Sequence, residues 1–145
     1  MGLLSKLTSK VTPQKKAGDD VLLLHGLMLM AGADGVIEQR EIDTLRQFWS
    51  TMPEFQGKDF DDTLDQANKV VAHYGNLKES IKALADIESE AVRKKLFVLA
   101  ADMAMSSGDV DETEDEMLES MQRLLNIDDD TATKCLEVLS IKYAQ

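Results

Sequence analysis

One pattern occurs twice in this chain of 145 residues, and it restricts the possible folds more than any other feature. In residues 28–48 and again in 103–121, an apolar run ends at a glycine-containing turn and an acidic amphipathic segment follows at once. A shift of about 73 positions places Gly35 on Gly108 and Glu41 on Glu114. A repeat this long is typical of one supersecondary unit used twice, so we expect two helical hairpins packed face to face about a pseudo-twofold axis.

Hydrophobic periodicity predicts helices along the rest of the chain, and no segment alternates apolar and polar residues as a strand would. Asp19 or Asp20 is expected to cap the first buried helix, which is apolar on every side and contains His25, expected as a core or edge residue rather than a ligand. The sequence therefore predicts an all-α, single-domain bundle of about seven or eight helices. The expected ranges are about 19–33, 37–51, 59–74, 76–87, 89–106, 111–125 and 128–143.

Charge is unevenly distributed along the chain. The formal net charge is −11, and residues 1–18 hold four lysines and no acid, so residues 19–145 carry −11 − 4 = −15. A body this acidic repels phosphate backbones, which argues against nucleic-acid binding and suits divalent cations or a basic partner. Cys135 is the only cysteine, so no intramolecular disulfide can form, and a reducing, cytoplasmic location is expected.

The beginning of the chain is basic and amphipathic. Residues 1–18 are expected to form a segment and linker ahead of a helical domain at 19–145, with Pro13 closing the segment. The segment can lie as a short helix on an anionic membrane surface, or it can cover a hydrophobic patch on its own domain. Its apolar residues fall on one helical face: Leu3, Leu4, Leu7 and Val11.

Carboxylates gather at the two repeated turns. Hard cations such as Ca²⁺ bind several oxygen ligands, and acids at a helix–turn–helix corner can supply them, although neither turn has the ligand pattern of an EF-hand. The alternative is purely structural, because Asp111 and Glu114 have the spacing of a capping box and acids favour a helix N-terminus. The candidate ligands for Ca²⁺ or another divalent cation are Asp34, Glu38, Glu41, Asp102, Asp109, Asp111 and Glu114.

Residues for enzymatic chemistry are poorly arranged in the sequence. The two histidines are far apart, no glycine-rich phosphate loop is present, and Cys135 belongs to an apolar helix. Asp102 interrupts the apolar face of the second buried helix, which is costly unless its carboxylate reaches a donor or a cation. We therefore expect a non-enzymatic protein.

The two turns resemble those of the TerB-like family of tellurite-resistance proteins. In that family a buried helix ends in Ala-Asp-Gly or Ser-Asp-Gly, and a helix with an early Glu follows. Here residues 32–41 match, whereas the second copy has Ser107 in place of the family's Asp. The resemblance covers about residues 19–127. It implies an all-helical pseudo-twofold domain in the cytoplasm or at the inner face of the membrane, and divalent cations at the acidic turns.

The resemblance also implies a role in metal or chemical stress, exerted through protein complexes. The leading hypothesis is thus a non-enzymatic interaction or adaptor domain with an unidentified protein partner. The alternative is a metal-free interaction domain that docks at the inner membrane surface through its N-terminal helix. A homodimer is compatible with either hypothesis.

Overall fold

Every regular element that the structure describes is helical. The computed structural model describes residues 17–32, 38–106, 108 and 110–145. The elements are α2 (Asp19–Ala31), α3 (Gln39–Thr51), the 3-10 helix η1 (Pro53–Phe55), α4 (Phe60–Tyr74), the 3-10 helix η2 (Glu79–Asp86), α5 (Glu90–Met105), α6 (Glu112–Leu124) and α7 (Asp129–Lys142). The all-α prediction is confirmed, while the pseudo-twofold repeat stays a prediction.

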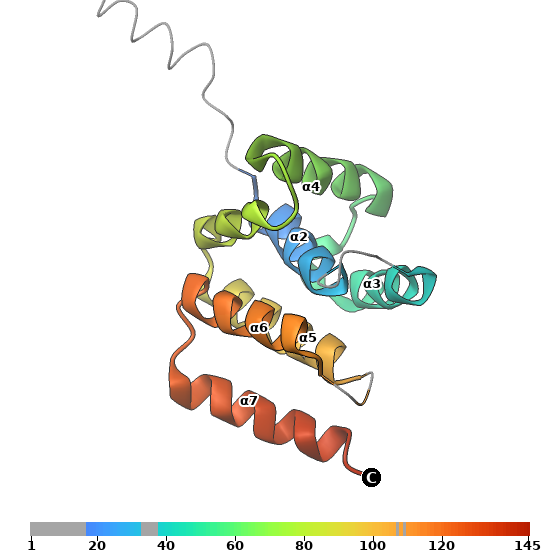
Figure 1. Cartoon of the computed structure of the whole chain (residues 1–145). Helices are drawn as coiled ribbons and strands as arrows, with labels where there is room; N and C mark the ends of the chain where they lie inside the picture. The colour runs from blue at the N-terminus through green and yellow to red at the C-terminus, as the bar shows by residue number, and fades with distance from the viewer. Residues whose placement is uncertain (1–16, 33–37, 107, 109) are drawn as a thin grey trace, which may run out of the picture.

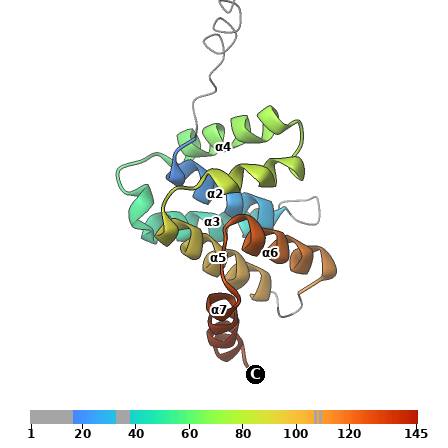
Figure 2. The same cartoon turned by 90° about the vertical axis from the view of Figure 1, so that its left-hand side faces the viewer.

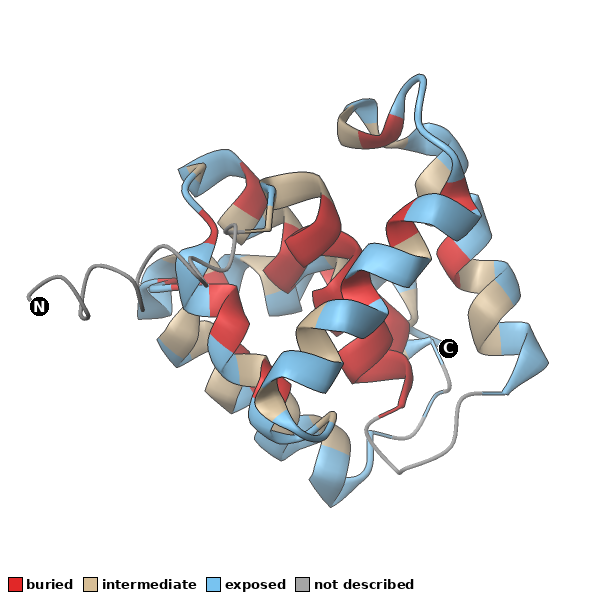
Figure 3. Ribbon diagram, turned by 90° about the horizontal axis from the view of Figure 1, so that it is seen from above, coloured by how far each residue is buried: buried red, intermediate tan, exposed pale blue. Residues whose placement is uncertain are grey.

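Helix α2 occupies the middle of the bundle. It contacts α3, α4, α5, α6 and both 3-10 helices, so no face of it is left for solvent. Figures 1 and 2 show α4 on one side of it and α5 with α6 on the other, with α7 outermost. Residues 21–31 of α2 are all buried, and the buried residues of Figure 3 gather around this helix and α5. Burial on all sides is what an all-round apolar helix requires.

Local capping sets where several helices begin. The side chains of Asp59, Ser89 and Asp128 accept hydrogen bonds from the backbone N–H three residues later, at the starts of α4, α5 and α7. These groups satisfy N–H donors that have no partner inside the helix. The expectation for α2 is wrong, because Gly18 stands at its N-cap while Asp19 and Asp20 lie inside its first turn. Both carboxylates bond elsewhere.

Asp19 ties the start of α2 to the start of α5. Its two carboxylate oxygens accept the backbone N–H groups of Glu88 and Ser89, each at 3.0 Å. Seven residues further along each helix, Gly26 lies against Leu96, so closely that a Cβ at Gly26 would be 2.4 Å from Leu96 Cδ2. The two helices therefore run side by side in the same direction, and their C-terminal ends lie at the same end of the molecule (Figure 1).

The segment after α4 is wound more tightly than expected. Asn76 Oδ1 accepts the N–H of Glu79 at 2.8 Å, and η2 then continues with 3-10 rather than α-helical geometry. Side chains three residues apart eclipse in such a helix, which places Ser80 and Ala83 in one row. Both residues are buried. The 3-10 winding of η2 therefore places Ser80 and Ala83 on the side of this helix that faces the core.

The side chain of His25, at the centre of α2, donates a hydrogen bond to the backbone carbonyl of Ser80. The distance from Nε2 of His25 to this oxygen is 3.0 Å, and the imidazole is fully buried. Nδ1 has no hydrogen-bond partner within the described part of the chain. Burial lowers the pKa of His25 from its usual 6.5, and the hydrogen bond to Ser80, which acts in the opposite direction, offsets only part of this shift. The ring is therefore a neutral core group that donates through Nε2.

Acidification is expected to destabilise the protein through His25. Because the pKa of His25 is lower in the folded than in the unfolded chain, the unfolded chain takes up the proton first as the pH falls below 6.5. The free energy of unfolding should fall from there until the folded-state pKa is passed. Urea unfolding at about pH 7.5 and about pH 5.5 measures this, above the range in which most carboxylates titrate.

Two variants separate this effect from other titrations. His25→Leu should be less stable near pH 7.5, since the Ser80 carbonyl loses its donor, but it should lose less stability on acidification. Exposed His73 is the matched control, and His73→Asn should keep the full pH dependence. An unchanged pH dependence in His25→Leu would contradict the prediction.

Helix α7 lies on the outside of the bundle against α5 (Figure 2). Its outer side keeps apolar residues in solvent, with Val138 63% and Ile141 76% exposed, while Leu139 is buried. Within the described ranges, no helix combines the length and the apolar character that crossing a membrane would need.

Candidate functional site

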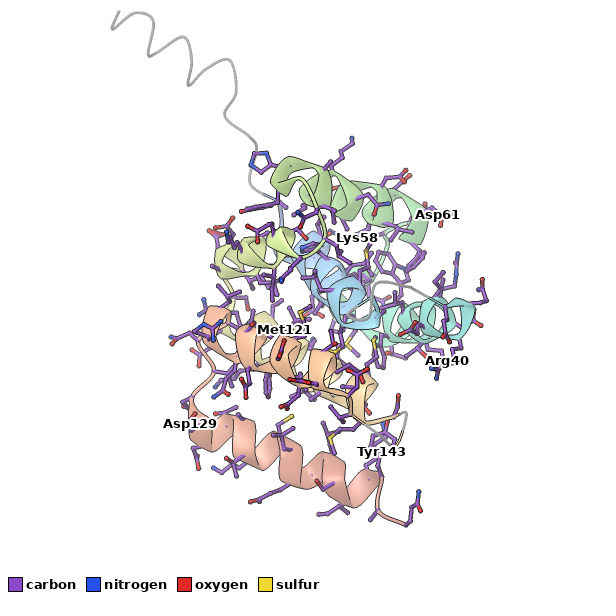
Figure 4. All side chains as sticks on the ribbon, viewed as in Figure 1. Arg40, Lys58, Asp61, Met121, Asp129 and Tyr143 are labelled. Atoms are coloured by element: carbon purple, nitrogen blue, oxygen red, sulfur yellow. The ribbon has the colours of Figure 1, made fainter. Side chains whose placement is uncertain are left out.

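The acids at the start of α3 are engaged in helix capping. Glu38 is the N-cap residue and forms a reciprocal capping box with Glu41. The N–H of Glu38 donates to Glu41 Oε1 at 2.8 Å, and Arg40 Nε donates to Glu38 Oε2 at 2.9 Å. Figure 4 shows Arg40 on this helix. The structural alternative raised by the sequence therefore applies to these two residues, whether or not a cation also binds.

The start of α6 is built in the same way. Asp111 Oδ1 accepts the N–H of Glu114 at 2.8 Å, and Glu114 Oε1 accepts the N–H of Asp111 at 3.3 Å. Acids in this first turn also interact favourably with the positive end of the helix dipole, as Glu112 and Asp115 do here. The predicted capping box between Asp111 and Glu114 is confirmed.

The two capped starts follow the C-terminal ends of α2 and α5, which lie at one end of the molecule (Figures 1 and 3). We call the acids of these starts the acidic end: Glu38, Glu41, Asp111, Glu112 and Glu114. Three of them, Glu38, Asp111 and Glu112, are exposed, and Glu41 and Glu114 are half-buried. Arg40 is the neighbouring cation and compensates part of the charge on α3.

The predicted ligand set is only partly visible. Asp34 and Asp109 lie outside the described residues. In the ranges 17–32, 38–106 and 110–145, no three His, Cys, Asp or Glu side chains come close enough together to hold a metal ion. The described candidates on α3 and α6 thus form two capping pairs, and a cation site would need oxygens from beyond these pairs. The prediction of a cation site stays open.

Asp102 has a different environment from the turns. Both of its oxygens accept from Lys142 Nζ, at 3.0 and 2.9 Å, and Oδ1 also accepts a short hydrogen bond from the hydroxyl of Tyr143. Figure 4 shows Tyr143 at the C-terminal end of α7. The carboxylate therefore reaches a donor and a cation, as its place on an apolar face requires. It joins α5 to the end of α7.

The same contacts shift neighbouring pKa values. The hydrogen bond to Asp102 raises the pKa of Lys142, and desolvation followed by the bond to Asp102 raises the pKa of Tyr143. Burial, with a smaller effect of the Asp102 charge, raises the pKa of Cys135. A protonated thiol is a poor nucleophile, so Cys135 acts as part of the packing between α7 and the bundle.

Comparison with known protein families identifies the relatives of this fold. Residues 21–135 match the family described as tellurite resistance protein TerB. The chain belongs to this family. The match runs from the first turn of α2 into α7 and ends before Lys142 and Tyr143, and it confirms the resemblance carried by the repeated turns. Searches among curated proteins and among solved structures gave no match.

The pairing of Asp102 with α7 was not predicted by the sequence. Its partners are 40 and 41 positions away and lie beyond the part of the chain that matches TerB. The available signal was an acid on an apolar face together with a Lys-Tyr pair at the end of another helix. Such a signal becomes specific only when the packing of α5 and α7 is known.

Proposed function

We propose that this chain is a non-enzymatic interaction module of a metal or chemical stress response, and that its acidic end binds a divalent cation such as Ca²⁺. The observation that carries the proposal is the parallel packing of α2 and α5, which directs two acidic helix starts to one end of the molecule. Membership of the TerB family, described by tellurite resistance, supports the stress context.

The non-enzymatic part is supported by the placement of the usual catalytic side chains. His25 is a neutral core group, His73 lies on the surface of α4, and the thiol of Cys135 has a raised pKa in a packed interface. Within the described part of the chain, no hydrogen bond joins any two of these three side chains, so none of them forms a nucleophile–base pair.

The cation part is supported by the chemistry of the donors. Carboxylate oxygens are the ligands that Ca²⁺ prefers, and the capping boxes hold Glu41, Asp111 and Glu114 in defined positions at the helix starts. Because the described carboxylates form pairs rather than a group of three, Asp34 and Asp109 supply the remaining oxygens in this proposal. In the sequence, these two acids stand ahead of the N-cap residues of α3 and α6, which are Glu38 and Asp111.

A cation is expected to stabilise the fold. At a hundred times the dissociation constant, a bound ion raises the free energy of unfolding by about 2.7 kcal/mol. Such a gain moves the thermal midpoint by several degrees. Thermal unfolding of chelated protein should therefore shift upward with one of Ca²⁺, Mg²⁺, Mn²⁺ or Zn²⁺. Asp34→Asn and Asp109→Asn should lose the shift.

The matched control is Asp130→Asn on α7, which removes the same charge at an exposed position away from the two turns and should keep the shift. If no cation moves the midpoint, the cation part is wrong and the acidic end must meet a basic partner directly. A lysine-rich peptide probes that case, with binding that falls as salt rises and weakens in Glu112→Lys. Failure of both probes would contradict the proposal as a whole.

A further inference from the structure

A groove of about 590 Å³ opens between the first turn of α2, one side of α4 and η2. The apolar residues that line it, here called its floor, come from all three elements: half-buried Val70 and Tyr74, and buried Val21, Leu22 and Ala83. Polar side chains form its rim: Gln66, Lys69, His73 and Asp86. A hollow of this volume, in the range of about 300–1,000 Å³ typical of ligand sites, has room for several aliphatic side chains.

The chain enters the described structure at this groove. Ala17 and Gly18 are part of its wall, so residues 1–16 are attached at the edge of the apolar floor. Val11 is six residues before Ala17, and six residues reach at most about 20 Å when extended. A tethered segment has an effective concentration of roughly millimolar at such a site, which makes even a weak contact populated.

We propose that the groove is the docking site of the N-terminal segment of the same chain, with the leucine face of residues 3–11 on its apolar floor. The apolar residues of this segment, at positions 3, 4, 7 and 11, fall on one face at helical spacing. That face meets the partly exposed side chains of the floor, Val70 and Tyr74. Docking removes apolar surface of the segment and of the groove from water, and this burial favours the docked segment over the free one.

Charge favours the same occupant. The first 18 residues carry four lysines and no acid, and the rest of the chain carries −15. Asp86 lies on the rim, and Asp62 lies on the exposed surface of α4 one turn before Gln66. Lys69 and His73 are also at the rim, so the attraction comes from the acidic body as a whole rather than from a dedicated ion pair.

A membrane is the competing occupant of the segment. A lysine-bearing amphipathic helix binds anionic lipid, but here the attached body of charge −15 would be held near the same anionic headgroups. The acidic body and the headgroups repel each other when they are within a Debye length, about 10 Å at 0.1 M salt. Docking in the groove involves no such repulsion, because the segment is attached beside the groove. The groove is thus the favoured site, and the segment is a cover over an apolar surface of its own domain.

The test places a spin label on the segment of the full chain. Ser9→Cys in a Cys135→Ala background carries a nitroxide, and NMR detects which amides lose signal beside it. We expect loss at Val70 and Ala83, recovery when the nitroxide is reduced, and no loss at Val138 on the far side of the bundle. Full signal at the groove amides would overturn the proposal.

Two substitutions identify the contacts. Leu7→Asp on the segment and Val70→Lys on the groove should each reduce the signal loss at the groove amides to that of an undocked tether, while Val138→Lys, the same change at an exposed site on α7, should not. An equal loss in Leu7→Asp would overturn the proposal. Vesicles of phosphatidylcholine with one quarter phosphatidylserine provide the last arm. Co-sedimentation of a chain whose groove signals are intact would assign the segment to the membrane instead.

Discussion

Gly26→Val is expected to lower the free energy of unfolding by about 3 kcal/mol. A Cβ at this position would lie 2.4 and 2.7 Å from Cδ2 and Cδ1 of Leu96, closer than carbon atoms can approach. Leu96 is fully buried, so its side chain has no open space into which it can move. The two helices α2 and α5 would have to separate at their contact, at the centre of the core. Urea unfolding measures the loss.

A double mutant shows whether the clash with Leu96 is the cause. Leu96→Ala alone should cost about 2–5 kcal/mol, because it leaves a cavity in the core. In the Gly26→Val background it should cost less, since the valine methyl groups occupy part of that space, giving a coupling of about 0.5–3 kcal/mol. Strict additivity would contradict the prediction. Gly26→Ala is a weaker probe, because better helix propensity, about 1 kcal/mol, offsets part of its clash.

Asp19→Ala is expected to lower the free energy of unfolding by about 2–3 kcal/mol, because two backbone N–H groups lose a charged acceptor. Those donors belong to Glu88 and Ser89, just before α5, and both bonds are 3.0 Å long. Asp19→Asn should be intermediate, since its amide keeps one acceptor oxygen and presents a donor to the other N–H. Urea unfolding with an unchanged m-value would assign the loss to the folded state.

Asp20 is the matched control for Asp19. It also lies in the first turn of α2, but its Oδ2 pairs at 2.6 Å with Nζ of Lys58, whose side chain is 46% exposed. Exposed ion pairs contribute about 0–1 kcal/mol, so Asp20→Ala should cost clearly less than Asp19→Ala. Equal losses in the two variants would mean that the acids act only through the helix dipole.

Both positions bear on the acidic end as well as on stability. Asp19 and the Gly26–Leu96 contact hold α2 and α5 side by side in one direction, and that direction is why their C-terminal ends lie at the same end of the molecule. An antiparallel pair would place the turns at opposite ends of the molecule. The proposed cation site therefore depends on contacts at the other end of these helices.

Helix positions were largely predictable because they follow local rules. Asp59, Asp111 and Asp128 cap helices in the structure as their sequence context indicates, and Ser89 caps the helix expected to begin near it. The second helix, expected at about 37–51, is observed as Gln39–Thr51. A capping side chain and the backbone N–H that it accepts are three residues apart, so the sequence nearby contains all the information needed. The same reasoning failed at Asp19, whose bonding partners are 69 and 70 positions away.

The features of the candidate site likewise fall into those that the nearby sequence predicts and those that depend on distant residues. The sequence identified the acids of the two turns and the capping box of Asp111 with Glu114, since both depend on short spacings. It could not find the partners of Asp102, the bond from His25 to Ser80, or the groove lined by α2, α4 and η2, because each joins distant segments.

By itself, then, the sequence determined an all-helical TerB-family chain, the main helices and the acids at the two turns, because periodicity, capping and charge act over a few residues. The tertiary structure decided that α2 and α5 run in parallel, that α7 is held by Asp102, and that an apolar groove lies where the chain enters α2. These features arise from close packing between segments far apart in the chain. The absence of a Cβ at Gly26 and the carboxylates of Asp19 and Asp102 favour one arrangement of the helices, whereas periodicity and capping are compatible with several.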